Sequence, residues 1–133
     1  MGLEQTEKKI FLEQNRTVIL AVDRNSSNLA LLSKFLSREG YEVIGASSIK
    51  NFEEKIIDET AIKLAIIDVS GFDKQIWNCC EILRSWDIPF LIISPKQSAV
   101  IKQQGMNYGA QQFLVKPLIV TEFLQIIKNL IED

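Results

Sequence analysis

Apolar residues along this chain occur in two alternating patterns, short continuous runs and longer stretches with helical spacing. The short runs are rich in β-branched residues, which is typical of strands buried on both faces of a sheet. They predict five strands, at residues 17–22, 41–46, 62–68, 89–94 and 111–116. The stretches that follow them repeat apolar residues every three or four positions. They predict five helices, at residues 28–40, 49–59, 74–85, 98–108 and 120–132.

Three of these helices carry more specific expectations. In the second, we expect Ile49, Phe52, Ile56 and Ile57 to share one buried side. The fourth contains Gly105 among glutamines, and its low helix propensity predicts that it is the most mobile helix. The last helix has more apolar residues than one core-facing stripe needs, which indicates either a partner or dimer surface or additional core packing. These residues are Phe123, Leu124, Ile126, Ile127, Leu130 and Ile131.

Strict alternation of strand and helix predicts a parallel α/β sheet, because right-handed crossovers return each strand in the same direction. In such sheets the ligand site lies beyond the carboxyl ends of the strands. Four polar residues stand at the carboxyl ends of the first, third, fourth and fifth strands: Asp23, Asp68, Ser94 and Lys116. We therefore expect these side chains to meet at one edge and to form the functional site.

This set of side chains suits phosphoryl transfer. A carboxylate can attack a phosphoryl group, and Asp68, at the centre of the sheet, is the expected nucleophile. An ammonium such as Lys116 and a hydroxyl such as Ser94 could contact the phosphoryl oxygens, while neighbouring acids bind Mg²⁺. Asp23 and Asp68 could instead be helix-capping acids, and Ser94 could be an ordinary serine at a strand end.

Composition narrows the function further. The 133 residues predict one domain at 17–133, preceded by an N-terminal extension or linker at 1–16. The net charge of −2 gives no basic field for nucleic acid, and no apolar run is long enough to span a membrane, so we expect a cytoplasmic protein. Without histidine, Ser-His-Asp catalysis and histidine-ligated zinc are excluded. The adjacent Cys79 and Cys80 are expected to be small, partly buried side chains rather than a redox or metal pair.

From Thr17 to Glu132 the chain resembles the receiver domain of bacterial response regulators, the CheY-like superfamily. The motifs are VILAVD with Asp23, LAIID with Asp68, FLIIS with Ser94 and FLVKPL with Lys116, in this order and at typical intervals. The resemblance implies a flavodoxin-like, doubly wound (βα)₅ fold with strand order 2-1-3-4-5. It also implies a two-component or phosphorelay signalling role, and no enzymatic activity beyond self-phosphorylation and autodephosphorylation at Asp68.

Further expectations follow from the same resemblance. A histidine kinase or phosphotransfer protein would phosphorylate Asp68, and Asp23, Asp68 and the backbone carbonyl of Ser70 would bind Mg²⁺. Ser94 and Phe113 would be switch residues, and the Lys116–Pro117 peptide would be cis. The output partner, or a second copy of the chain, would bind the face formed by helix 98–108, strand 111–116 and helix 120–132. No segment resembles a DNA-binding domain, so we expect no direct nucleic-acid contact and output through a partner or through other domains of a longer protein.

Several residues depart from the family pattern. In the loop after Asp68, Gly71, Phe72 and Ile76 stand where the family has Met-Pro and a later glycine. Arg24 stands where the family has a second acid, so two acids and two bases would cancel at the site and weaken Mg²⁺ binding. Pro95 follows Ser94 where a small residue is usual, and it stiffens the loop. Arg24 could replace the charge of the metal near Asp68. Alternatively, the chain could be a phosphorylation-independent pseudo-receiver that acts by protein–protein interaction, or Arg24 could point into solvent without a role.

Overall fold

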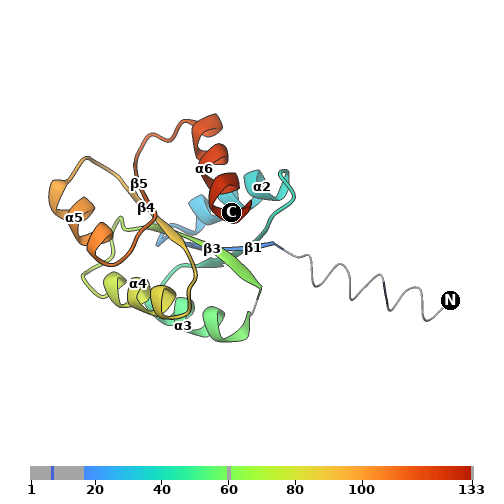
Figure 1. The fold of residues 1–133 in the computed structure, drawn as a ribbon, viewed down its shortest axis with the longest axis horizontal. Coiled ribbons are helices and arrows are strands. Elements are labelled where there is room, and N and C mark those ends of the chain that lie inside the picture. Colours follow the sequence, from blue (N-terminus) through green and yellow to red (C-terminus); the bar gives the residue numbers. More distant parts are fainter. Residues whose placement is uncertain (1–6, 8–16, 60, 133) are drawn as a thin grey trace.

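A computed structural model describes residues 7, 17–59 and 61–132 of the chain. Strands and helices alternate from residue 18 onward (Figure 1). The strands are β1 (Val18–Val22), β2 (Glu42–Ala46), β3 (Ile62–Asp68), β4 (Phe90–Ser94) and β5 (Gln112–Val115). The helices are α2 (Ser26–Ser37), α3 (Ile49–Asp58), α4 (Ile76–Ser85), α5 (Ala99–Asn107) and α6 (Val120–Glu132). The expected extension at 1–16 lies, apart from Glu7, outside the described residues.

All five strands are parallel and form one sheet in the order β2-β1-β3-β4-β5. The central strand β3 pairs with β1 on one side and with β4 on the other, where Asp68 lies opposite Ile93. Strand order reverses between β1 and β3, as in other doubly wound sheets. The predicted flavodoxin-like fold and strand order are confirmed.

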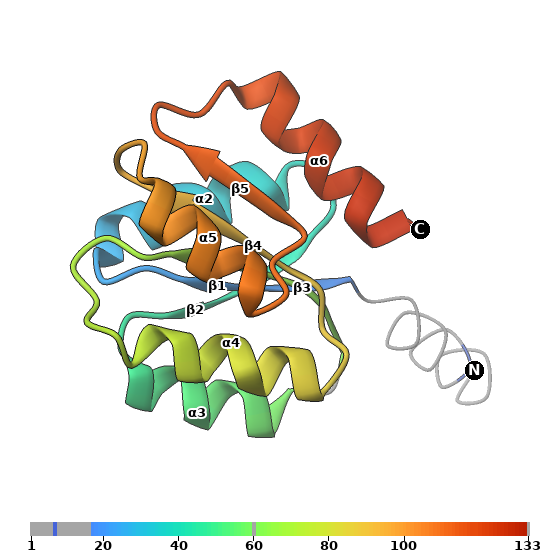
Figure 2. The ribbon, with the colours of Figure 1, turned by 60° about the vertical axis from the view of Figure 1, so that its left-hand side comes forward.

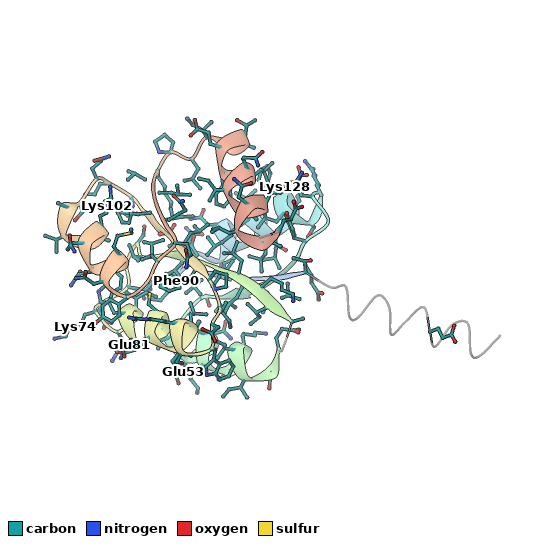
Figure 3. All side chains as sticks on the ribbon, in the orientation of Figure 1. Glu53, Lys74, Glu81, Phe90, Lys102 and Lys128 are labelled. Atoms are coloured by element: carbon teal, nitrogen blue, oxygen red, sulfur yellow. The ribbon has the colours of Figure 1, made fainter. Side chains whose placement is uncertain are left out.

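Each face of the sheet has its own apolar core because alternate residues of a strand point to opposite faces. Val18, Leu20 and Val22 of β1 pack with the residues of α3, α4 and α5, whereas Ile19 packs with those of α2 and α6. Figure 2 shows α3 and α4 side by side beneath the sheet and α6 on the opposite side. In Figure 3, Phe90 lies in the interior, while the labelled charged side chains lie at the periphery. The sheet is therefore covered on both faces.

Side-chain caps fix where several helices begin. Asn25 accepts a hydrogen bond from the Asn28 amide and begins α2 two residues before the predicted start. Ser48 and Ser98 cap α3 and α5 in the same way. The predicted start of α4 was two residues early, because the carboxylate of Asp73 accepts a bond from the Gln75 amide in a turn that precedes the helix.

The structure corrects one expected core residue and favours one reading of the last helix. Phe52 and Ile56 are buried, but Ile57 is 70% exposed because it lies about 100° around α3 from Ile56. In α6, Phe123 and Ile127 are buried, and the other four apolar residues named above pack against the same core. The additional apolar residues of α6 therefore serve core packing.

Gly105 of α5 and the two cysteines of α4 all lie in closely packed parts of the structure. A Cβ at Gly105 would lie 2.6 Å from Cδ1 of Ile92, so glycine allows α5 to approach β4. Cys79 and Cys80 are free and buried in the core, and burial raises the pKa of each thiol to about 12. Both cysteines are therefore more deeply buried than the partial burial that the sequence predicted. The mobility of α5 stays a prediction. No helix among the described residues is long and apolar enough to cross a membrane.

Candidate functional site

Four sequence-predicted residues lie at the carboxyl edge of the sheet. Asp23 follows β1, Asp68 and Ser94 end β3 and β4, and Lys116 follows β5. Asp68 and Ser94 are the only polar residues among the described ones that are buried with the core. A polar side chain at such a position needs a partner, because burial without one costs free energy.

Asp68 has a partner on each carboxylate oxygen. Its Oδ2 lies 2.5 Å from the Nζ of Lys116, and its Oδ1 accepts a 2.9 Å hydrogen bond from the Ser70 amide. The Asp68 side chain is 5% exposed and that of Lys116 is 36% exposed. The carboxylate is thus fixed in the protein, while the lysine reaches it from the solvent side.

Asp23 lies at the same edge of the sheet, and the pKa of its carboxyl is shifted by several neighbours. Burial raises the pKa of its carboxyl above the ordinary 3.8, and the nearby charge of Asp68 raises it further. Hydrogen bonds from the Asn25 amide, at 2.8 Å, and from the Asn28 side chain act in the opposite direction, as does the charge of Lys116. Two carboxylates that repel each other at the edge of a core form a site that favours a cation.

Arg24 does not lie against Asp68. Its Nη1 donates a 2.7 Å hydrogen bond to the carbonyl of Gly71, and its Cζ lies 5.9 Å from the ring centroid of Phe72. Within the described residues, the cation paired with Asp68 is Lys116. The structure therefore shows neither an ion pair of Arg24 with Asp68 nor an Arg24 side chain without a contact. Among the described residues, Lys116 is the cation that offsets the charges of Asp23 and Asp68.

The expected switch residues sit on β4 and β5. Ser94 is fully buried, and its Oγ donates a 2.7 Å hydrogen bond to the carbonyl of Lys96, across Pro95. Phe113 is half-buried, pairs in register with Ile92 and packs against the core. The Lys116–Pro117 peptide is cis, as expected. In this structure the Ser94 hydroxyl is engaged with the loop after β4.

The site opens into a groove of about 800 Å³ between α2 and the start of α6. Asp23, Asn28, Asp68 and Lys116 form its polar end. Most of the remaining lining is apolar and comes from α2, β4, the segment around Pro117 and α6: Leu31, Leu32, Phe35, Ile93, Pro95, Pro117, Leu118, Val120 and Phe123. The carboxylate edge is therefore reached along an apolar surface.

A profile of the response regulator receiver domain matches residues 19–128. The chain belongs to this family. It is 30% identical over 124 residues to the transcriptional regulatory protein GltR of Pseudomonas aeruginosa, a match that covers 90% of the chain and 51% of GltR. It thus spans about half the length of that relative. Receiver domains of this family act in two-component signalling and are typically phosphorylated on aspartate; they are generally not enzymes.

Solved receiver domains share the same fold. A CheY-like receiver domain protein from Methanospirillum hungatei superposes with a TM-score of 0.80 at 24% identity, over 89% of this chain and 95% of that one. The non-phosphorylated receiver domain of HemR from Leptospira biflexa gives a TM-score of 0.76 at 26% identity, over 89% of this chain and 96% of that one.

Receiver domains commonly bind Mg²⁺ at the phosphorylation site, and the residues here fit that ion. Mg²⁺ is often bound by one or two carboxylates with water and phosphate oxygens, and Asp23 and Asp68 supply two carboxylates. No cluster of three or more acidic, histidine or cysteine ligands occurs among the described residues. Among the described residues, the buried Oγ of Ser70, two residues after Asp68, has no hydrogen-bond partner.

Sequence reasoning missed the neighbours of this receiver site. Asn28 bonds Asp23 from the first turn of α2, and its position five residues after a site acid was the available signal. The sequence singles out Gly71 and Phe72 as departures from the family pattern, but it does not indicate that they contact Arg24. An arginine at the position where the family has an acid indicated that this side chain has a different contact, but the sequence did not show which group it contacts.

Proposed function

We propose that this receiver domain accepts a phosphoryl group on Asp68 from a histidine kinase or phosphotransfer protein. A carboxylate oxygen of Asp68 attacks the phosphorus of phosphohistidine. The new O–P bond forms as the P–N bond breaks, and the electron pair of that bond stays with the imidazole nitrogen. The observation that supports the proposal most strongly is the ion pair of the buried Asp68 with Lys116 at the polar end of the groove.

The neighbouring residues would neutralise and follow the transferred group. Lys116 already lies beside Asp68, so its ammonium can move onto a phosphoryl oxygen with little displacement. Ser94 reaches the same group only after its hydroxyl leaves the carbonyl of Lys96. Asp23 and Asp68, with the backbone carbonyl of Ser70 as a third predicted ligand, would bind Mg²⁺. When bound, the ion supplies positive charge to the phosphoryl oxygens.

Apolar residues that line the groove or are exposed indicate two surfaces at which this chain would bind partners. The groove between α2 and α6 would receive the apolar face of the phosphodonor, because it ends at Asp68. Val100 and Met106 of α5 and Ile119 and Val120 near the start of α6 are exposed, which supports an output partner or a second copy on the α5–β5–α6 face. We place this exchange in the cytoplasm, where ATP supplies histidine kinases.

The intact mass of the protein after incubation with acetyl phosphate tests the proposal. We expect one added phosphoryl group in the presence of Mg²⁺, and no addition with EDTA or in Asp68→Asn. Asp73→Asn is a matched control, because Asp73 lies in the loop after β3 and its carboxylate accepts a hydrogen bond from the nearby Gln75 amide, which an amide oxygen can also accept. It should be phosphorylated like the wild type.

The other outcomes are also informative. Phosphorylation that is equal with and without Mg²⁺ would contradict the metal site. Phosphorylation of Asp68→Asn would assign the acceptor elsewhere. If a folded wild-type protein gained no phosphoryl group from acetyl phosphate or from phosphorylated histidine donors, the phosphoacceptor function would fail and a pseudo-receiver that acts through protein contacts would replace it.

A further inference from the structure

The loop between β3 and α4, residues 69–75, contains a tight turn directly after Asp68. The Phe72 amide donates a 3.2 Å hydrogen bond to the carbonyl of Val69, and Gly71 has a φ of +75°. A positive φ at the third residue of such a turn, with an ordinary φ at Ser70 before it, is the signature of a type II turn. Glycine takes this conformation without steric cost.

The type of this turn matters for the site because Ser70 and Gly71 are its two central residues. Type I and type II turns differ chiefly in the ψ of the second residue, which rotates the peptide between the second and third residues. That peptide includes the carbonyl of Ser70, the predicted metal ligand. The amide of Ser70 bonds Asp68. Whatever fixes the turn therefore also fixes the surroundings of the phosphoacceptor.

Arg24 contacts this turn at two points, and its aliphatic part lies close to Gly71. Its Nη1 bonds the carbonyl of Gly71 at 2.7 Å, its Cζ lies 5.9 Å from the ring centroid of Phe72, and its Cδ lies 3.4 Å from the place a Cβ on Gly71 would take. Planar guanidinium groups combine hydrogen bonding with stacking on aromatic rings, which the ammonium of lysine does less well. The fit to this loop is therefore specific to arginine.

We propose that Arg24 is a positioning residue that holds the turn Val69–Phe72 and thereby orients Ser70 beside Asp68. The functional role in this inference rests on the proposed phosphoacceptor function, whereas the contacts of Arg24 with the turn do not. At the position where the family has a metal-binding acid, this chain would instead brace the loop that carries a metal ligand. The charge of Arg24 would be incidental, and its shape and hydrogen bond would matter.

Arg24→Lys tests the proposal because it keeps the charge and removes the planar guanidinium. The first readout is amide hydrogen exchange at Ser70 and Phe72, measured by NMR without Mg²⁺ or phosphodonor. We expect about tenfold faster exchange, from the loss of one hydrogen bond and one cation–π contact. Phe72→Leu should give a smaller acceleration, because it removes the ring and leaves the bond to Gly71.

Arg38→Lys is the matched control, because Arg38 is exposed at the end of α2, away from the loop. It should exchange like the wild type at Ser70 and Phe72. Unchanged exchange in Arg24→Lys, or equal acceleration in Arg38→Lys, would overturn the proposal. Arg24 is exposed, so Arg24→Lys should keep the wild-type urea midpoint, which separates a local effect from loss of fold.

The second readout is the Mg²⁺ concentration for half-maximal phosphorylation by acetyl phosphate. We expect several times more Mg²⁺ to be needed in Arg24→Lys, with the maximal rate restored at saturating Mg²⁺. An unchanged requirement would contradict a positioning role, because it would show that the charge alone matters. If no variant, including the wild type, is phosphorylated, the proposed function fails, while the exchange measurement still decides whether Arg24 holds the loop.

Discussion

The ion pair of Asp68 and Lys116 predicts an asymmetric response to mutation. Lys116→Met leaves a carboxylate with 5% exposure and one remaining hydrogen bond, from the Ser70 amide. Asp68→Asn leaves an ammonium that is already 36% exposed and can turn into water. An amide at position 68 also keeps an oxygen that can accept the Ser70 bond. The lysine variant should therefore be the less stable of the two.

The size of the effect follows from burial. Removing one partner of a fully buried ion pair costs about 3–5 kcal/mol. Here one partner is more than a third exposed and Asp68 retains a hydrogen bond, so we expect Lys116→Met to cost about 1–3 kcal/mol. For Asp68→Asn we expect a change within about 1 kcal/mol of zero, because the cost of burying a charge disappears with the charge.

Urea unfolding near neutral pH with EDTA measures these differences, with Trp77 and Trp86 as fluorescence probes. The double variant Asp68→Asn/Lys116→Met closes a mutant cycle and should be about as stable as Asp68→Asn alone. The slopes of the unfolding curves should agree, since the exposed area on unfolding is the same. Wild-type stability in Lys116→Met, or an equal loss in both single variants, would refute the reasoning.

Three further predictions concern single sites. Burial raises the pKa of Asp23, so its charge destabilises the fold once the pH rises through that pKa. Asp23→Asn should therefore exceed wild-type stability at about pH 7 and match it at about pH 3 in urea unfolding without Mg²⁺, and lower stability at neutral pH would contradict this. Gly105→Ala places a Cβ 2.6 Å from Cδ1 of Ile92. Overpacking of about 1–3 kcal/mol should outweigh a helix-propensity gain of about 1 kcal/mol, and a higher melting temperature would argue against that contact. With pKa values of about 12, the thiols of Cys79 and Cys80 should react with a disulfide reagent only as fast as the protein opens, whereas rapid labelling of the native protein would show that they are accessible.

The sequence pattern was sufficient to predict a parallel α/β sheet, because strands and helices differ in period and the inner strands β1, β3 and β4 are largely buried apolar runs. The strand order was predicted only from the resemblance to receiver domains. The sequence pattern also located Asp68 and Lys116, since charged residues that end buried strands of a parallel sheet must meet at one edge. The bounds of β3 and α6 match the structure residue for residue. Helix starts were less accurate, because a cap such as Asn25 decides them through one side-chain bond.

The sequence could not predict which group a long exposed side chain such as Arg24 contacts. Arg24 follows a site acid, and its charge alone favoured Asp68 as its partner. The structure instead pairs it with the carbonyl of Gly71, a backbone group that carries no residue-specific signal. The prediction that Ile57 is buried was wrong for a related reason, because a position at the boundary of a helical stripe can face either the core or solvent. Such choices depend on tertiary neighbours rather than on local pattern.

Mapping of the phosphorylated residue tests the central claim most directly. The protein would be incubated with acetyl phosphate and Mg²⁺ and reduced with borohydride, which converts an aspartyl phosphate to homoserine, and its peptides would then be sequenced by mass spectrometry. The account predicts homoserine at position 68 and aspartate at positions 23 and 73. Homoserine at another position, with Asp68 intact, would contradict it.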